Sequence, residues 1–379
     1  MKVAYVHVLP LELYPPARNL LVLMSNREGW EVRAWSTSND RGMGTWGAQG
    51  VRIDRHSYPG EKVPVPIRMA GYAAWHMKTA AELARWKPDV VMMVEPHSSL
   101  AVWLYYRLFR GSARLFIHHH EYYAPEDFNA PGMRLLRSTL GLERNYLFPR
   151  AEWVSQTNSG RLDLLQSWNR QIQPGAARVF PNYPPREWVT AANAVVTGNR
   201  SGPTRFVYVG SASFEDTYIR EVCEWAAAQP ETVSLHVVGH NVRKTVWESI
   251  QSLGAANITS DPAGVAYDEL PSLLRHFDVG LVLYRGNTLN FVHIVPNKAI
   301  EYLACGLEVW YPGRMHGLRN FHRDHPDLRL KEMNFQNLEP YAEAPEAGNA
   351  RAGEFEFIAE TAAEPLLSLM TEAGEANRR

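Results

Sequence analysis

Residues 287–306 hold side chains suited to binding a diphosphate. A polar loop leads to Pro296, which suits the first turn of a helix, and Gly306 suits its end. The N–H groups and the dipole at such a helix start attract anions, and the Lys298 ammonium could join them on a phosphate. Glu301, about one turn further, could accept hydrogen bonds from ribose hydroxyls. It could equally form an ordinary local pair with Lys298.

A second group of polar residues, His118, His119, His120 and Glu121, ends an apolar segment that begins at Ala113. Alternation along a strand predicts His118 and His120 on one face and His119 on the other. Three interpretations stay open: a metal site whose further ligands the sequence does not identify, a hydrogen-bonded structural cluster, or a ligand site. The last places His120 and Glu121 at the carboxyl end of a parallel strand, where ligands bind in open α/β sheets.

Two further features concern an acceptor. Glu95 and His97 follow the apolar segment 90–94 and are candidates for the acceptor side. The stretches 103–114 and 134–150 mix Arg with Leu, Tyr and Phe. One interpretation is a surface that lies near anionic lipid or a lipid-linked acceptor. The other is a set of amphipathic helices that face the core and extend their Arg side chains to water.

These residues need a scaffold of alternating strands and helices. Short apolar segments predict parallel strands, and helical periods fall between them. The pattern runs once through the first half, restarts near residue 205, and indicates two successive doubly wound α/β domains. The expected strands are 3–9, 31–36, 90–94, 113–118, 205–210, 233–239 and 279–284, and the expected helices are 19–24, 68–86, 100–109, 215–229, 268–277, 296–305 and 355–371. The predicted divisions are 1–182, a linker at 183–203, 204–350, and a C-terminal helical segment at 351–379.

Composition excludes several classes of protein. With 45% hydrophobic and 11% aromatic residues among 379, the chain must bury a large core. No apolar run approaches the length of a membrane span, and the first residues read as a strand rather than a secretory signal. Two cysteines exclude a disulfide framework. The net charge of −1 divides into a basic first half and an acidic second half. No segment of the sequence resembles a nucleic-acid-binding motif.

The run from Pro296 to Gly306 closely resembles the donor-site helix of retaining GT-B glycosyltransferases. Other segments resemble parts of that family in matching order and cover most of the chain. They are the strands 206–210 and 235–239 that end on glycine, the helix and strand at 267–280, the His-Glu segment 118–123, and the interdomain turn 180–185.

The resemblance implies two Rossmann-like domains that face each other across a cleft, with the C-terminal helix crossing back to the first. It implies transfer of a sugar from a UDP or GDP donor to a glycan or lipid-linked hydroxyl acceptor, of the hexosyltransferase type, with retention, and without metal or other cofactor. We expect a cytoplasmic protein, at most peripheral on the inner membrane face, that binds no nucleic acid. The implied catalytic residues are His120, Glu121, Lys298 and His293. The implied donor-side residues are Gly210, Gly239, Arg285, Asn287, Asn290, Pro296, Asn297, Lys298 and Glu301, and the acceptor-side residues are Arg18, Glu95, His97 and His118.

Two departures from the family stand out. Position 293 is His where many members have the first of two glutamates eight residues apart, and Glu301 is the second. Residues 12–19, with Arg18, replace a common Gly-Gly loop. Two alternatives therefore remain: a nucleotide-sugar 2-epimerase of the same fold, and a catalytically silent module that partners another transferase.

Overall fold

The computed structural model describes residues 1–38, 45–57, 63–129, 133, 137–193, 202–239, 242–342 and 355–378. It contains two compact units. The N-terminal unit comprises Met1–Asn182 together with Ala359–Arg379, and the C-terminal unit comprises Tyr183–Ile358. Residues 194–201 of the predicted linker, and the predicted boundary between residues 350 and 351, lie outside the described residues. No helix among the described residues is both long and apolar enough to cross a membrane.

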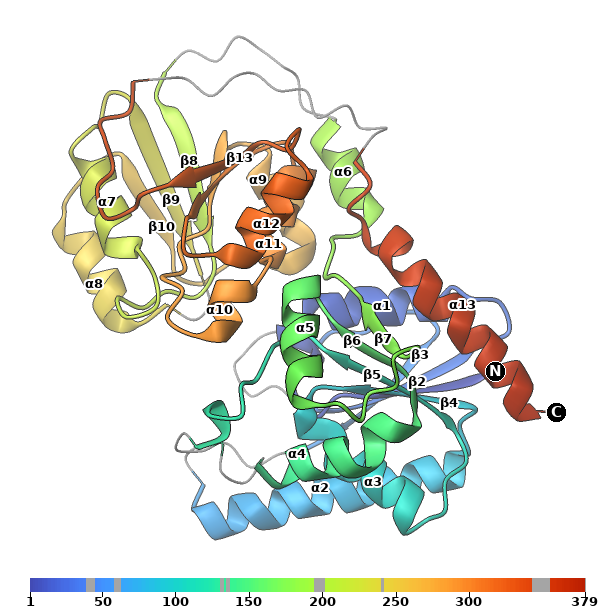
Figure 1. The fold of residues 1–379 in the computed structure, drawn as a ribbon. Helices are drawn as coiled ribbons and strands as arrows, with labels where there is room; N and C mark the ends of the chain where they lie inside the picture. The colour runs from blue at the N-terminus through green and yellow to red at the C-terminus, as the bar shows by residue number, and fades with distance from the viewer. Residues whose placement is uncertain are drawn as a thin grey trace. The chain divides into compact units, whose positions relative to one another are not determined.

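The N-terminal unit is built on a parallel sheet in the order β3-β2-β1-β4-β5-β6-β7 (Figure 1). Its strands are β1 Lys2–Val6, β2 Glu31–Thr37, β3 Val51–His56, β4 Val90–Val94, β5 Arg114–His119, β6 Ala151–Gln156 and β7 Ala177–Val179. Because the order reverses between β1 and β4, the carboxyl ends of these neighbouring strands flank the topological switch point where ligands bind in such sheets.

Helices cover both faces of this sheet. Along β1, Val3 and Tyr5 pack with α1 and the C-terminal helix α13, whereas Ala4 and Val6 pack with α2 and α3. The helices are α1 Pro15–Ser25, α2 Val65–Trp86, α3 Ser99–Arg107, α4 Arg137–Leu142, α5 Ser159–Trp168 and α13 Ala359–Arg378. An ion pair between Arg27 and Glu364 adds to the apolar contact of α13. The last helix thus belongs to the first core although its sequence follows the second domain.

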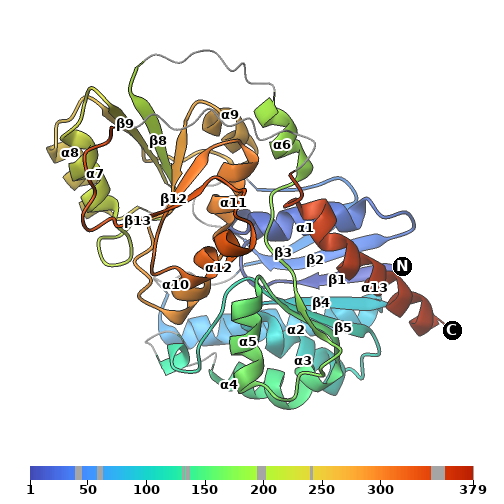
Figure 2. The same cartoon turned by 45° about the horizontal axis from the view of Figure 1, so that its top comes forward.

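The C-terminal unit has a parallel sheet in the order β10-β9-β8-β11-β12-β13 (Figure 2). Phe206 and Tyr208 of β8 pack on the face covered by α7 and α8, and Val207 and Val209 on the face covered by α11. The strands are β8 Thr204–Val209, β9 Val233–Val238, β10 Ile258–Asp261, β11 Val279–Leu281, β12 Glu308–Pro312 and β13 Leu330–Met333, and the helices are α6 Arg186–Asn193, α7 Ile219–Ala227, α8 Lys244–Ser252, α9 Leu270–Leu274, α10 Leu289–His293, α11 Asn297–Ala304 and α12 His316–Asp324.

Short helical turns connect these elements. They are the 3-10 turns Leu11–Leu13, Pro96–Ser98, Asp127–Asn129, Phe148–Arg150 and Tyr267–Glu269 and the π-helical turn Glu143–Leu147. The expected elements are present with shifted ends. The first strand stops at Val6 rather than residue 9, the helix expected at 215–229 is α7, and the last helix begins at Ala359 rather than residue 355.

Candidate functional site

Polar side chains gather in the N-terminal unit where β1, β4 and β5 end. We call His7, Glu95, His118, His120 and Glu121 the strand-end cluster. His7 directly follows β1, Glu95 follows β4, and the three others lie at the end of β5 or just beyond it. These strands are neighbours in the sheet, so the fold brings together residues that are far apart in the sequence.

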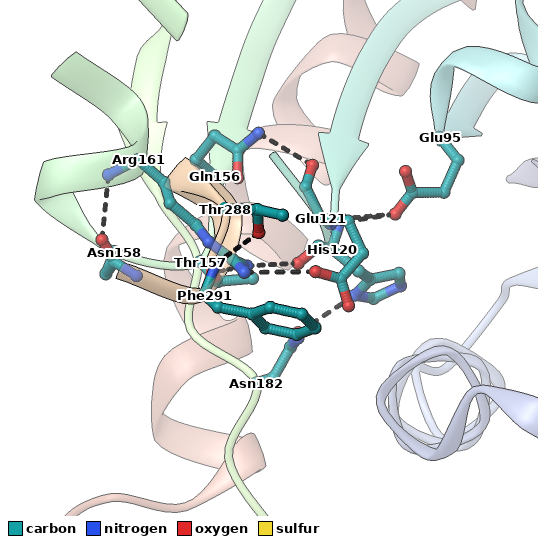
Figure 3. A network of polar contacts seen from close by, with 10 residues as sticks. All are labelled: Glu95, His120, Glu121, Gln156, Thr157, Asn158, Arg161, Asn182, Thr288 and Phe291. Atoms are coloured by element: carbon teal, nitrogen blue, oxygen red, sulfur yellow. Dashed lines mark hydrogen bonds and ion pairs between the residues drawn. The ribbon is translucent and has the colours of Figure 1, made fainter. Parts of the chain in front are cut away.

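Glu95 holds the backbone of the cluster. Its side chain is fully buried, and its Oε1 accepts hydrogen bonds from the amides of His120 at 2.7 Å and Glu121 at 3.2 Å (Figure 3). Its φ of 64° lies in the left-handed region, which costs free energy in a residue with a side chain. Burial raises the pKa of Glu95 to about 7, despite the nearby His119 and the two amides.

Two histidines of the strand-end cluster, His118 and His120, are joined by a hydrogen bond. His118 Nε2 lies 3.1 Å from His120 Nδ1, and His118 Nδ1 lies 2.8 Å from the Ser155 hydroxyl. His120 Nδ1 also contacts Asn182 Oδ1 at 3.1 Å (Figure 3). Burial lowers the pKa of His118 well below its ordinary value and that of His120 to about 4. Both rings are therefore neutral at physiological pH.

Arg161, in the first turn of α5, fixes the peptide after His120. Its side chain is almost fully buried, with Nη1 donating to the His120 carbonyl at 2.8 Å and to Thr157 Oγ1 at 3.1 Å. Its Nη2 donates to Glu121 Oε2 at 3.1 Å (Figure 3). The Glu121 side chain is 40% exposed, so its carboxylate faces solvent on one side and a fixed cation on the other.

His119 points to the opposite face from His118 and His120, as strand alternation predicts. Its Nε2 lies 3.1 Å from Glu143 Oε1, which also accepts from the Ser99 hydroxyl at 2.8 Å. Burial opposes protonation of His119, but the Glu143 carboxylate, with a further contribution from Glu95, outweighs burial and raises the pKa of His119. This pair lies in the protein interior and supports the structural interpretation for that one histidine.

The remaining acceptor-side candidates, His97 and Arg18, lie against aromatic rings. His97 packs edge-on against Tyr123 with ring centroids 5.7 Å apart, and burial lowers its pKa to about 4. The Arg18 guanidinium lies 5.3 Å from the ring centroid of Trp46. His7, which the sequence analysis missed, is buried edge-on against Tyr14, and neither of its ring nitrogens has a hydrogen-bond partner among the described residues.

In the C-terminal unit, α11 carries the expected Lys-Glu pair. Lys298 and Glu301 form an ion pair in the first turns, and Glu301 is only 2% exposed while the Lys298 side chain is 26% exposed. Pro296 is the N-cap rather than a residue of the first turn, and no side chain caps the helix start. Tyr302 ties α11 to the sheet, because its hydroxyl accepts from the Val209 amide at 2.9 Å. The helix start therefore presents backbone amides and a partly exposed cation beside a buried carboxylate.

The two glycines lie at adjacent strand ends, Gly210 after β8 and Gly239 after β9. A Cβ on Gly239 would lie 2.2 Å from the Gly210 carbonyl oxygen, and a Cβ on Gly210 would lie 3.3 Å from the Tyr208 hydroxyl. Of these two positions, only Gly239 requires glycine for lack of space.

Other donor-side candidates are engaged within the protein. Arg285 donates to Glu221 Oε1 at 2.5 Å and to the Phe214 carbonyl at 3.1 Å, and Asn287 donates to the Glu215 carbonyl at 2.5 Å. These contacts hold the loop before α10 against α7 and the segment that precedes it. Arg285, an implied donor-side residue, thus has its charge paired with Glu221 in this structure.

Helix α10 contains the last two candidates, Asn290 and His293, and both are partly buried. Thr288 caps this helix, with its hydroxyl accepting from the Phe291 amide at 3.2 Å (Figure 3). The ring centroids of His293 and His316 are 6.3 Å apart, and a Cβ on Gly317 would lie 2.3 Å from the His293 carbonyl oxygen. The close approach of α12 thus fixes the backbone at position 293.

Two expectations concern metals and surfaces. In the described part of the chain, no three His, Cys, Asp or Glu side chains are grouped so as to hold a metal ion. In the basic stretches, Arg107 and Arg150 lie over the Tyr146 ring at 5.6 and 3.6 Å, and Arg114 pairs with Glu152. Those contacts agree with helices whose Arg side chains extend along aromatic surface.

No protein-family model matches the chain, and no curated protein matches it by sequence. Its structure, in contrast, is similar over nearly the whole length to solved glycosyltransferases. Sucrose-phosphate synthase from Thermosynechococcus elongatus matches with a TM-score of 0.62 at 16% identity, covering 100% of this chain and 96% of that one. A glycosyltransferase from Rickettsia africae gives 0.63 at 12%, covering 98% of each. HepE from Anabaena, solved with UDP and glucose, gives 0.61 at 13%, covering 99% and 98%. The chain therefore has the GT-B fold of these enzymes.

Proposed function

We propose that this protein is a glycosyltransferase that moves a sugar from a UDP or GDP donor to a hydroxyl acceptor, with retention and without a metal ion. The observation that carries the proposal is the start of α11, where Lys298 is paired with the buried Glu301. The amides and the ammonium would stabilise the charge that develops on the leaving diphosphate. The Glu301 carboxylate would accept hydrogen bonds from the ribose hydroxyls.

The neighbours support a nucleotide-sugar donor. HepE is solved with UDP and glucose, and a further structure of the same fold, from E. coli, is bound with UDP-2-fluoro glucose at a TM-score of 0.59 and 12% identity. At such identities the likeness reaches the fold alone, so the donor assignment for this chain depends on its own α11 residues.

We assign the acceptor to the strand-end cluster of the N-terminal unit. Its neutral histidines and Glu121 lie at the carboxyl ends of neighbouring strands, where an open α/β sheet binds ligands. In this role His120 would orient the hydroxyl that attacks the sugar carbon. We further propose that the acceptor is a glycan or lipid-linked glycan in polysaccharide or glycoconjugate assembly, at the cytoplasmic face of a membrane.

The proposal is tested by product analysis. The protein is incubated with UDP-glucose, UDP-galactose or GDP-mannose and a panel of glycan and lipid-linked acceptors, and products are followed by NMR. A new glycosidic bond with the donor's anomeric configuration supports the proposal. Epimerisation at C2 without an acceptor would make the protein an epimerase, and donor binding without turnover on any acceptor would favour the silent partner module.

A further inference from the structure

A chain of hydrogen bonds runs from a backbone carbonyl to His120. It begins at Ile117, whose carbonyl oxygen lies 3.4 Å from the Ser155 hydroxyl. A carbonyl oxygen can only accept, so a Ser155 hydroxyl that donates to Ile117 has its lone pairs left for a second donor. Ser155 Oγ then accepts from His118 Nδ1, 2.8 Å away across the paired strands β5 and β6. A neutral His118 therefore carries its proton on Nδ1 and a lone pair on Nε2.

The next step of the chain determines the proton position on His120. Its Nδ1 lies 3.1 Å from His118 Nε2, and two lone pairs cannot form a hydrogen bond. Asn182 Oδ1, which can only accept, also lies 3.1 Å from His120 Nδ1, so a proton on His120 Nδ1 satisfies both contacts and sets the direction of the chain back to Ser155. Because the ring is neutral, the other nitrogen, Nε2, has a lone pair.

The ring of His120 is held in place as well as oriented. Its amide donates to Glu95 Oε1 at 2.7 Å, and its carbonyl accepts from Arg161 Nη1 at 2.8 Å. Burial keeps the ring neutral, and the Arg161 cation adds to this by opposing a second positive charge. Within the described residues, His120 Nε2 is buried and has no hydrogen-bond partner. A buried acceptor without a partner is costly unless a water or a ligand satisfies it.

We propose that Ser155, His118 and Asn182 are positioning residues that fix His120 in its Nδ1-protonated tautomer, so that Nε2 accepts a hydrogen bond from a substrate hydroxyl. The inference rests on the proposed function only for the identity of that substrate. This tautomer excludes an anionic phosphate oxygen at His120 Nε2, because both the oxygen and Nε2 would be acceptors without a proton between them. It therefore selects a sugar hydroxyl, from either the donor sugar or the acceptor.

The tautomers can be read on the full-length protein without any substrate. Long-range 1H–15N spectra distinguish protonated from unprotonated imidazole nitrogens, and the variants His118→Gln and His120→Gln assign the two rings. We expect protonated Nδ1 and unprotonated Nε2 in both rings. A protonated Nε2 on His120 would overturn the relay, whatever the activity of the protein.

Two ligand additions identify the source of the hydroxyl. UDP-glucose or GDP-mannose offers a donor sugar, and a free hexose at high concentration offers acceptor hydroxyls. A hydrogen bond donated to Nε2 moves its 15N resonance toward the protonated position. The ligand whose addition causes this shift is the source of the hydroxyl. If neither addition moves the resonance, the hydroxyl contact is wrong even if the tautomers are as inferred.

The variant Asn182→Asp tests the positioning role through pH. The groups around the His120 ring are His118, His7, Tyr14, His119, Glu95, Glu121 and Arg161. A carboxylate at Nδ1 should raise the pKa of His120 from about 4 by about 2 units. A protonated ring can no longer accept at Nε2. Sugar transfer by this variant should therefore fall about tenfold between pH 8 and pH 5, relative to the wild type at each pH.

The matched control is Asn145→Asp, which makes the same change at an exposed position of the same unit. It should follow the wild-type pH profile. If Asn182→Asp also follows that profile while it folds and binds donor normally, the positioning role of Asn182 is refuted.

Discussion

Replacing Glu301 by glutamine removes one charge and almost no volume from the start of α11. The carboxylate is 2% exposed, so a ligand hydroxyl bound to it would have little competition from water. A hydrogen bond to a charged group contributes about 1.5–3 kcal/mol, and about 1.4 kcal/mol changes an affinity tenfold. Glu301→Gln should therefore weaken binding of UDP, or of GDP if that is the nucleotide the wild type binds, by about 10- to 100-fold.

The same substitution should leave the fold intact. Glutamine avoids the cost of burying a charge, and Lys298, with its side chain 26% exposed, remains hydrated without its partner. We expect the free energy of unfolding to change by no more than about 1 kcal/mol. Calorimetric titration with UDP measures the affinity, and a thermal melt of the same sample measures stability.

The matched control is Glu248→Gln on α8, where the exposed Lys244–Glu248 pair has an N–O distance of 3.3 Å. This variant should bind UDP as the wild type does. If Glu301→Gln binds UDP with wild-type affinity and melts normally, the carboxylate does not contact the nucleotide, and the assignment of α11 as the donor helix fails.

Two further predictions concern stability. Gly239→Ala should lower the free energy of unfolding by about 1–3 kcal/mol, because the new Cβ would lie 2.2 Å from the Gly210 carbonyl oxygen. Gly210→Ala should lower it by less, and equal losses of the two variants in urea unfolding would contradict this. Glu95 binds its proton more tightly in the folded state, with a pKa of about 7 against an ordinary 4.5, so the folded state loses stability as pH rises from 4.5 through 7. Glu95→Gln should remove this loss, on the order of 3 kcal/mol, and an unchanged pH dependence of unfolding would refute it.

The sequence predicted many of the elements with strong apolar patterns, but not the largely buried strands β6 and β12. Central strands such as β4 are apolar throughout because both faces are covered by helices. The edge strands β3 and β13 were not predicted, since the sequence of β3, Val51–His56, is mostly polar and β13, Leu330–Met333, buries only one residue fully. Edge strands are defined by pairing with a neighbour, which a local pattern does not reveal.

The site was predictable only in part. Spacing along one helix brought Lys298 and Glu301 together, because residues three apart share a helix face. Arg161 was missed, since arginine in a helix usually faces water, and only the pairing of β5 with β6 brings α5 to the His120 carbonyl. The partner of Arg285, Glu221, is 64 residues away in sequence, so its pairing could not be read from spacing.

We infer that the C-terminal unit binds a nucleoside diphosphate at the start of α11. The most direct measurement is calorimetric titration of the wild-type protein with UDP and with GDP, each with and without EDTA. We predict binding of one of them with a Kd of about 1 μM, corresponding to about −8 kcal/mol, that EDTA does not change. Binding of neither nucleotide, or binding that EDTA abolishes, would contradict a metal-independent nucleotide site on α11.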